Sequence, residues 1–434
     1  MVKISFLGSC REVGRSAILI ESKNGTKCML DYGIRFRGEE RLPYNGADIK
    51  HLKACMITHC HIDHSGAIPY LYKNSEMPFY TNAVTLSIIK ELIEDQLRIS
   101  DFPYPFGMRE LRKAMANAVF LENGIKQKIA NDVFITFYNA GHVPGSVSIL
   151  IEVDKKKILY TGDINPSETN LVSSANATEI PPIDAMITES TYALRNHPPR
   201  EVLEENFVIN ISNITENGGK VLIPAFGVAR SQEILMILEK YNYKGPIFIS
   251  GLAKEISQIY LDYPDSLKNQ KRYRSAFNKA QFISKKGSSF VSKLNGVIIA
   301  PSGMLKGGTA INFVKSFLND PLSAIYLVGY QVDGSPGRKL LDEGMFVYKE
   351  KYRNKSKMRN FSIRAKCDAD YFDFSSHGDI EHLNNYIEHL TFSNGSRDIF
   401  CVHGDPKSTT TLAKMLVNKD YNSVAPEIGE IYKI

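Results

Sequence analysis

The stretch "THCHIDHSG" (residues 58–66) places three histidines and one aspartate within six consecutive positions. The whole chain has only 10 histidines, so three of them within six positions are an unusual concentration. The run "LKACMITH" before it predicts a short buried strand that ends at His59, with His61, Asp63 and His64 on the following loop. Imidazole and carboxylate groups are the ligands that borderline metals such as Zn²⁺ prefer. A lone histidine is more often structural, but four ligand-type residues so close together predict a metal site.

Further ligand candidates follow later predicted strands: His142 in "NAGHVPGS", Asp163 in "YTGDIN" and His403 in "CVHGDP". Asp163 by itself could be a turn residue. If it bridges two ions, each ion has four ligands: His59, His61, His142 and Asp163 for one, and Asp63, His64, Asp163 and His403 for the other. Two ions about 3.5–4 Å apart are a known device for hydrolysing phosphoesters. The predicted cofactor is therefore two Zn²⁺ per chain.

Chain length and composition indicate the number of domains and the class of protein that carries this site. A chain of 434 residues predicts two domains, and its 43% hydrophobic content is that of a globular protein. The formal net charge of +6 is mild and carries little weight by itself. Six scattered cysteines without a CxxC pair predict reduced thiols and a cytoplasmic protein. The sequence has no apolar run of about 18 residues, so we expect no membrane span.

The order of predicted elements changes along the chain. Short strands ending in polar residues dominate the first part, with an amphipathic helix expected over residues 83–99. From about residue 200, strands and helices alternate, which is typical of a parallel sheet built from βαβ units. After a basic stretch the chain returns to site-like loops, "FSSHGD" and "FCVHGD". We therefore predict one domain made of residues 1–195 and 356–434, interrupted by an inserted domain of residues 196–355.

Together, these motifs resemble the metallo-β-lactamase superfamily, and within it the β-CASP nucleases of the cleavage-and-polyadenylation-specificity-factor type, in their compact archaeal or bacterial form. Asp31 in "MLDYG" matches a superfamily motif, while Glu189 in "TESTY", His377 in "SSHGD" and His403 match the β-CASP motifs. The resemblance extends over nearly the whole chain, including the segments "REVGRS" (11–16), "VLIPAFGVARSQEIL" (221–235), "APSGMLKGG" (300–308) and "GYQVDGSPGRKL" (329–340). It implies an α/β fold: an αββα sandwich carrying an inserted parallel-sheet β-CASP domain.

The resemblance also implies roles. His377 is the expected general acid, which would protonate the leaving 3′ oxygen and leave a 5′ phosphate on the product. Glu189 and Asp31 are expected to orient histidines, and Asp63 and Glu189 to take part in catalysis. A structural histidine at 377, a solvated carboxylate at 189 and a turn aspartate at 31 are the plainer alternatives. His403 favours RNA over DNA, because DNA-acting relatives tend to carry an aliphatic residue there.

Substrate contacts are expected in the inserted domain. The Gly-rich loop "PSGMLKGG" offers Ser302 and Gly303 to phosphate, and "GSPGRKL" offers Arg338 and Lys339. Arg230 and Lys254 are further basic candidates, and Ser250 lies at a strand-to-helix junction. Each loop has an equally good explanation as ordinary turn chemistry.

The sequence therefore predicts a zinc-dependent ribonuclease, mainly endonucleolytic with some 5′→3′ exonuclease activity, that acts in RNA processing or decay. RNA is the expected substrate, a homodimer is the expected assembly, and components of an RNA-processing complex are the expected partners. Two alternatives remain open: a small-molecule hydrolase of the lactamase or glyoxalase type, and a non-catalytic scaffold in RNA processing.

Overall fold

A computed structural model describes residues 1–35, 40–44, 49, 51–283, 295–351, 358–393, 395 and 397–434. The chain forms two compact units, one of Met1–Asn196 with Ser376–Ile434 and one of His197–Ser375. The sequence placed the second boundary at 355/356, earlier than the structure does. The reason is that strand β19 (Asp368–Tyr371) pairs with β16 (Ala324–Leu327) and so belongs to the second unit.

The first unit contains two seven-stranded sheets. The order of the first sheet is β22 (Ile431–Lys433), β1 (Lys3–Phe6), β2 (Ile18–Glu21), β3 (Lys27–Leu30), β4 (Ala54–Met56), β5 (Phe79–Thr81) and β6 (Ala118–Phe120). The order of the second is β21 (Asn422–Val424), β20 (Asp398–Val402), β11 (Ala185–Glu189), β10 (Lys156–Tyr160), β9 (Val147–Val153), β8 (Val133–Asn139) and β7 (Gln127–Ala130). Alternate residues of both sheets, such as Ile20, Ile149 and Phe400, share one buried core.

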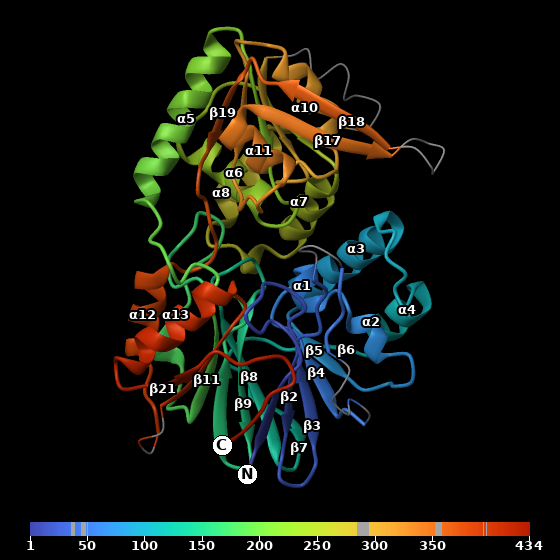
Figure 1. The fold of residues 1–434 in the computed structure, drawn as a ribbon, viewed down its shortest axis with the longest axis vertical. Helices are drawn as coiled ribbons and strands as arrows, with labels where there is room; N and C mark the ends of the chain where they lie inside the picture. Colours follow the sequence, from blue (N-terminus) through green and yellow to red (C-terminus); the bar gives the residue numbers. More distant parts are fainter. Residues whose placement is uncertain are drawn as a thin grey trace. The chain divides into compact units, whose positions relative to one another are not determined.

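Helices cover the outer faces of these sheets (Figure 1). Beside the first sheet lie α1 (Ile62–Ser65), α2 (Ile68–Leu71), α3 (Ala83–Ile99) and α4 (Met108–Ala116). Beside the second lie α12 (Ile380–Glu388) and α13 (Pro406–Val417), whose Leu383 and Leu412 pack with Ile399 of β20. The predicted αββα sandwich is confirmed, as is the helix predicted over residues 83–99.

The second unit is built around a parallel sheet of six strands. Their order is β14 (Ala280–Ile283), β13 (Ile247–Ser250), β15 (Gly296–Ala300), β12 (Lys220–Pro224), β16 and β19. Among the described residues of this unit, the helices are α5 (Arg200–Glu216), α6 (Arg230–Lys240), α7 (Leu252–Asp262), α8 (Gln270–Lys279), α10 (Ile311–Leu318) and α11 (Pro336–Glu343). A hairpin of β17 (Met345–Lys351) and β18 (Met358–Arg364) completes the unit. Leu222 and Ile298 pack against Phe313 of α10, while α5 contacts β12 and β15 as well as α6. The predicted inserted α/β domain is confirmed.

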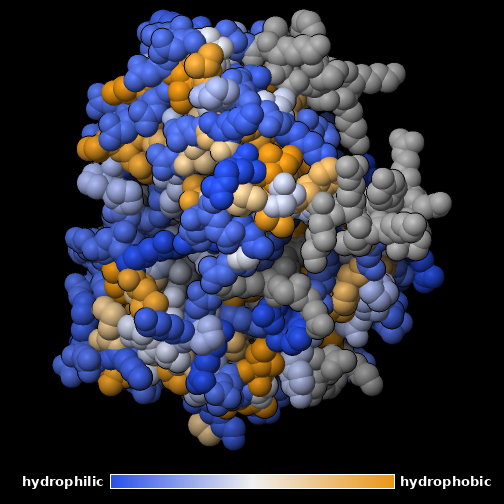
Figure 2. All heavy atoms as spheres, turned by 45° about the horizontal axis from the view of Figure 1, so that its top comes forward, coloured by the Kyte–Doolittle hydropathy of each residue, from blue (hydrophilic) through white to orange (hydrophobic). Residues whose placement is uncertain are grey.

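Polar residues cover most of the face drawn in Figure 2, and the apolar residues there lie in separate patches. Among the described helices, none combines the length and the apolar character needed to cross a membrane.

Candidate metal centre

Strand ends of the first unit bring the predicted ligands together. His59 follows β4, His142 follows β8, Asp163 follows β10, and His403 follows β20. The sequence had suggested a loop for Asp63 and His64. In the structure both residues lie in the short helix α1. His64 stays close to His59, with ring centroids 4.2 Å apart, but its Nε2 faces His403 while His59 Nε2 faces His61, so six consecutive positions serve two groups.

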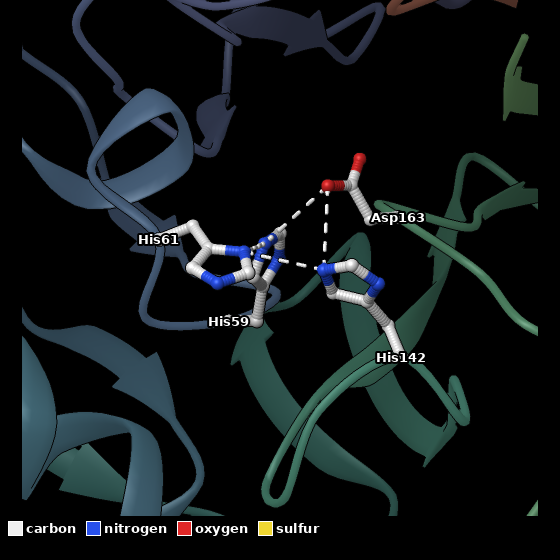
Figure 3. Close-up of side chains that lie close together, drawn as sticks. All are labelled: His59, His61, His142 and Asp163. Carbon is white, nitrogen blue, oxygen red and sulfur yellow. Dashed lines mark hydrogen bonds and ion pairs between the residues drawn. The ribbon is translucent and has the colours of Figure 1, made fainter. Parts of the chain in front are cut away.

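The first group consists of His59, His61, His142 and Asp163 (Figure 3), whose ligand atoms all lie within 4.8 Å of one another. His61 Nδ1 lies 3.1 Å from His59 Nε2 and 3.2 Å from His142 Nε2. Asp163 Oδ2 lies 3.5 Å from His59 Nε2 and 3.6 Å from His142 Nε2. Three ring nitrogens and one carboxylate oxygen therefore face a common point, as the sequence grouped them.

The second group consists of Asp63, His64 and His403. His403 Nε2 lies 3.3 Å from His64 Nε2 and 3.4 Å from Asp63 Oδ2. The other oxygen of Asp163, Oδ1, lies 3.2 Å from His64 Nε2 and 3.1 Å from His403 Nδ1. Asp163 thus turns one carboxylate oxygen to each group, which is the arrangement that the predicted bridge requires.

The hydrogen bonds of the rings determine which nitrogens are ligand atoms. His142 Nδ1 donates to the carbonyl of Ser376 at 2.8 Å. Thr58 Oγ1 donates to Asp31, so its lone pairs accept from His59 Nδ1 at 3.0 Å. In the neutral rings the Nε2 atoms then carry lone pairs, and these lone pairs point at His61 Nδ1 and at Asp163. His61 Nδ1 carries at most one proton, so it can satisfy only one of these lone pairs, and the other is repelled by the acceptors around it unless a cation lies among them.

The pKa values of these groups follow from burial and from their neighbours. Burial lowers the pKa of His59, His61 and His142, and nearby histidines lower it further for each of them, so these rings are neutral and can act as ligands. Burial also lowers the pKa of His64, but Asp163 and Asp31 outweigh it and raise the pKa well above its usual value. A positive charge is therefore favoured between these two carboxylates, whether it is a proton or a metal ion.

Asp31 is fully buried after β3 and holds His64 in place. Its Oδ2 lies 2.7 Å from His64 Nδ1 and accepts from Tyr160 Oη at 2.8 Å, while its Oδ1 accepts from the backbone N–H of Thr58 at 2.8 Å. These bonds fix His64 so that Nε2 faces the second group. The backbone of Asp31 is left-handed, with a φ of 55°, a conformation that costs about 1–3 kcal/mol and has to be stabilised by the surroundings.

Glu189 ends β11 and lies against His377, which comes from the loop before α12. Both carboxylate oxygens lie 2.9 Å from His377 Nδ1, and Oε1 also accepts from the backbone N–H of Ile164 at 2.7 Å. Burial lowers the pKa of His377, but Glu189 and Asp163 outweigh burial and raise the pKa to about 9. Asp163, Glu189 and His377 also meet the geometric conditions for a metal group, yet the bonds to Glu189 already account for His377 Nδ1.

Three family models match the chain. Residues 10–200 match the metallo-beta-lactamase superfamily, residues 231–340 the Beta-Casp domain, and residues 362–426 the Zn-dependent metallo-hydrolase RNA specificity domain. RNase aCSPSF2 of Saccharolobus solfataricus is 33% identical over 98% of this chain and 84% of its own length. The probable RNase MJ4 of Methanocaldococcus jannaschii is 31% identical over the full length of both chains. This chain belongs to the β-CASP branch of the metallo-β-lactamase superfamily.

Two other similarities are informative. The transcription termination factor FttA of Methanothermobacter thermautotrophicus is 31% identical over 95% of this chain and 69% of its own length. The crystal structure of a protein of unknown function from Enterococcus faecalis aligns with a TM-score of 0.63, at 16% identity, over 99% of both chains. This second similarity concerns the fold alone. The similarity to FttA agrees with the β-CASP assignment of this chain.

The donor set of this β-CASP chain fits divalent metal ions. Asp163 Oδ1 is buried and has no hydrogen-bond partner among the described residues, although two ring nitrogens lie close to it. A buried acceptor of this kind is costly unless an ion satisfies it. Imidazole and carboxylate donors are the combination typical of a divalent metal site in a hydrolase.

The predicted substrate residues all lie in the β-CASP unit. Ser250 ends β13, while Ser302 and Gly303 follow the neighbouring strand β15, so all three lie at the carboxyl edge of the sheet. Ser250 Oγ lies 2.7 Å from Thr309 Oγ1. Ser302 Oγ is buried and has no hydrogen-bond partner among the described residues. These positions suit a loop that receives a ligand at the edge of a parallel sheet.

The basic substrate candidates are more dispersed. Arg230 begins α6, Lys254 is exposed on α7, and Lys339 lies on α11. Arg338 is exposed on α11 but forms an ion pair with Asp342 at 2.7 Å, which offsets part of its charge. Phosphate binding by these residues stays a prediction.

Sequence reasoning missed several residues that support the site. Tyr160 bonds to Asp31, Ser16 Oγ lies 3.3 Å from His64 Nε2, and the carbonyl of Ser376 holds His142. Tyr160 lies within the motif "YTGDIN" and Ser16 within "REVGRS". The sequence therefore marked both residues as parts of motifs but did not indicate what either one does. The carbonyl of Ser376 gives no side-chain signal in the sequence.

Proposed function

We propose that this chain is a zinc-dependent ribonuclease that hydrolyses RNA phosphodiester bonds with two metal ions at one centre. The proposed cleavage is mainly endonucleolytic, with some 5′→3′ exonuclease activity, and serves RNA processing or decay. The observation that carries the proposal is the position of Asp163, whose two oxygens face the two ligand groups separately. The relatives named as RNases and the match to an RNA specificity domain support RNA as the substrate.

His59, His61, His142 and Asp163 would hold one Zn²⁺, and Asp63, His64, His403 and Asp163 the other. When bound, two such ions lower the pKa of water and stabilise the negative charge that develops on the attacked phosphate. Asp63 and His377 lie where substrate can reach them, since 26% and 19% of their side chains are exposed. His61 is half-buried, and the other ligand side chains (His59, His64, His142, Asp163 and His403) are almost fully buried, so the substrate approaches from the side of His61, Asp63 and His377.

His377 supplies the proton that the leaving group needs. Hydrolysis adds water across the P–O3′ bond, and the departing 3′ oxygen takes the proton from the imidazolium of His377. The products are a 3′ hydroxyl and a 5′ phosphate. Glu189 keeps the ring oriented and stabilises its charged form through Nδ1.

The test is cleavage of 5′-labelled and internally labelled RNA by the zinc-loaded protein, beside the Asp63→Ala variant. We expect internal fragments from the wild type, their absence with the variant, and loss of cleavage when a chelator removes the metal. Release of only the 5′ nucleotide would replace the endonuclease by an exonuclease. Equal behaviour of both proteins would contradict the proposal and favour a scaffold. Hydrolysis of a β-lactam or thioester without any RNA cleavage would favour a small-molecule hydrolase.

A further inference from the structure

Helix α8 carries an unusual share of the protein's positive charge. Residues 266–283 include five basic side chains and no aspartate or glutamate, in a chain whose net charge is only +6. All five are exposed: Lys268, Lys271, Arg272, Arg274 and Lys279. A local excess of this size creates a positive potential over one face of the β-CASP unit.

The helix is held rigidly by its opposite face. Tyr273 and Ala276 are buried, and Tyr273 Oη donates to the carbonyl of Ser257 on α7 at 3.0 Å. The rings of Tyr273 and Tyr260 pack edge to face with centroids 6.3 Å apart. The basic side chains therefore project from a helix whose backbone is held in place. This lowers the conformational entropy that is lost when a ligand binds.

The two flanks of this exposed face differ. On one flank Glu239 accepts from Lys279 at 2.6 Å and from Ser275 at 2.7 Å, and Arg272 also lowers the pKa of Glu239. On the other flank, Lys271 and Arg274 form no ion pair with any residue that the structure describes. The helical spacing of three residues places Lys271 and Arg274 side by side. Their charges are therefore available to a ligand.

The exposed face also indicates the class of ligand. Across the described part of segment 264–283, no large hydrophobic side chain is exposed. Protein interfaces normally need an apolar or aromatic centre, whereas a nucleic-acid backbone needs mainly cations. We propose that the exposed face of α8, centred on Lys271 and Arg274, binds the phosphate backbone of single-stranded RNA outside the metal centre. This inference rests on the proposed ribonuclease function.

The experiment compares two double variants with the same change of charge. Lys271→Glu with Arg274→Glu alters the α8 face, and Lys128→Glu with Lys155→Glu is the control. Lys128 and Lys155 are exposed in the first unit, on β7 and in the turn between β9 and β10, away from the strand ends that carry His142 and Asp163. Binding of a long, cleavage-resistant phosphorothioate RNA is measured by fluorescence anisotropy over a range of salt concentrations, using zinc-loaded protein.

We expect the α8 variant to bind RNA at least about 10-fold more weakly at low salt. The slope of log affinity against log salt should fall by about 1.4, which corresponds to two lost phosphate contacts on a single strand. The control should bind like the wild type, and a neutral Lys271→Gln, Arg274→Gln pair should give an intermediate loss. Equal binding by the α8 variant and the control would overturn the proposal. Because binding is measured apart from cleavage, weak binding by the α8 variant would support this face even if the wild type cleaved no RNA.

Discussion

Glu189 holds the ring of His377 with both of its carboxylate oxygens, each 2.9 Å from Nδ1. The same carboxylate accepts from the backbone N–H of Ile164, next to Asp163. One side chain thus links the orientation of the proposed acid to the loop of Asp163, the proposed shared ligand. This link makes Glu189 a positioning residue whose effect can be separated from metal binding.

Glu189→Gln should lower the rate of RNA cleavage by about 100-fold, because the amide cannot stabilise the charged ring as the carboxylate does. Zinc content should stay unchanged, since the amide oxygen can still accept from Ile164. Single-turnover cleavage and metal analysis of the same preparation provide the measurements. Glu152 on β9 forms an ion pair with Lys126. Glu152→Gln is the control and should keep full activity. Loss of zinc in Glu189→Gln would show that the carboxylate supports the metal centre instead.

Asp31→Asn should weaken metal binding about 10–100-fold, the usual effect of losing a carboxylate that orients a ligating histidine. The reason is that Asp31 fixes His64 at 2.7 Å and is itself held by Thr58 and Tyr160. Zinc titration with a competing chelator measures the change. Tyr160→Phe removes only one of the supporting bonds, so its affinity should lie between those of the wild type and Asp31→Asn. Unchanged zinc affinity in Asp31→Asn would exclude the orienting role.

Asp163→Ala should impair both ligand groups, because Asp163 is the residue that both of them approach. We expect zinc content to fall for both sites and cleavage to drop by about 1000-fold, equivalent to about 4 kcal/mol of transition-state stabilisation. Asp63→Ala removes a ligand of the second group alone and should retain the first ion. Metal analysis of both variants decides the question: one retained ion in Asp163→Ala would contradict a shared ligand.

Glu204→Gln should destabilise the β-CASP unit by about 3 kcal/mol, as expected when one partner of a buried ion pair is removed. Glu204 is buried and contacts Arg200 at 2.8 Å and Lys240 at 2.9 Å. Burial raises the pKa of Glu204, but Lys240 and Arg200 outweigh burial and lower it overall. A lowered pKa means that this stability is present above the unfolded pKa, near 4.5, and is lost as the pH falls through the folded pKa.

Denaturant unfolding at pH 7 and at pH 4 measures this effect. The difference between wild type and Glu204→Gln should be largest at pH 7 and should shrink in acid. Glu201→Gln, at an exposed position of the same helix, is the matched control and should unfold like the wild type. A difference that is independent of pH would mean that packing around Glu204, rather than its charge, stabilises the unit.

The sequence alone determined the class of chemistry and the list of ligand candidates. Four ligand-type residues within positions 59–64 are a local pattern, and metal ligands can be recognised by residue type and spacing. The αββα sandwich with its inserted domain was also predictable, because strand and helix periodicity is local and the order of the motifs resembles one family. The strand ends at His142, Asp163 and His403 were visible for the same reason.

Only the tertiary structure decided how far apart these residues lie and which neighbours hold them. Strand β10 pairs in parallel with β11, and β11 pairs in parallel with β20, so strand ends from distant segments bring Asp163, Glu189 and His403 to the same edge of the sheet. The hydrogen bonds that Tyr160 donates to Asp31 and that His142 donates to the carbonyl of Ser376 join segments more than a hundred positions apart. The domain boundary near 375 likewise depended on β19 adding to the sheet beside β16. Spacing along the chain reports which side chains are available, whereas burial and long-range pairing determine their distances, their protonation and their orientation.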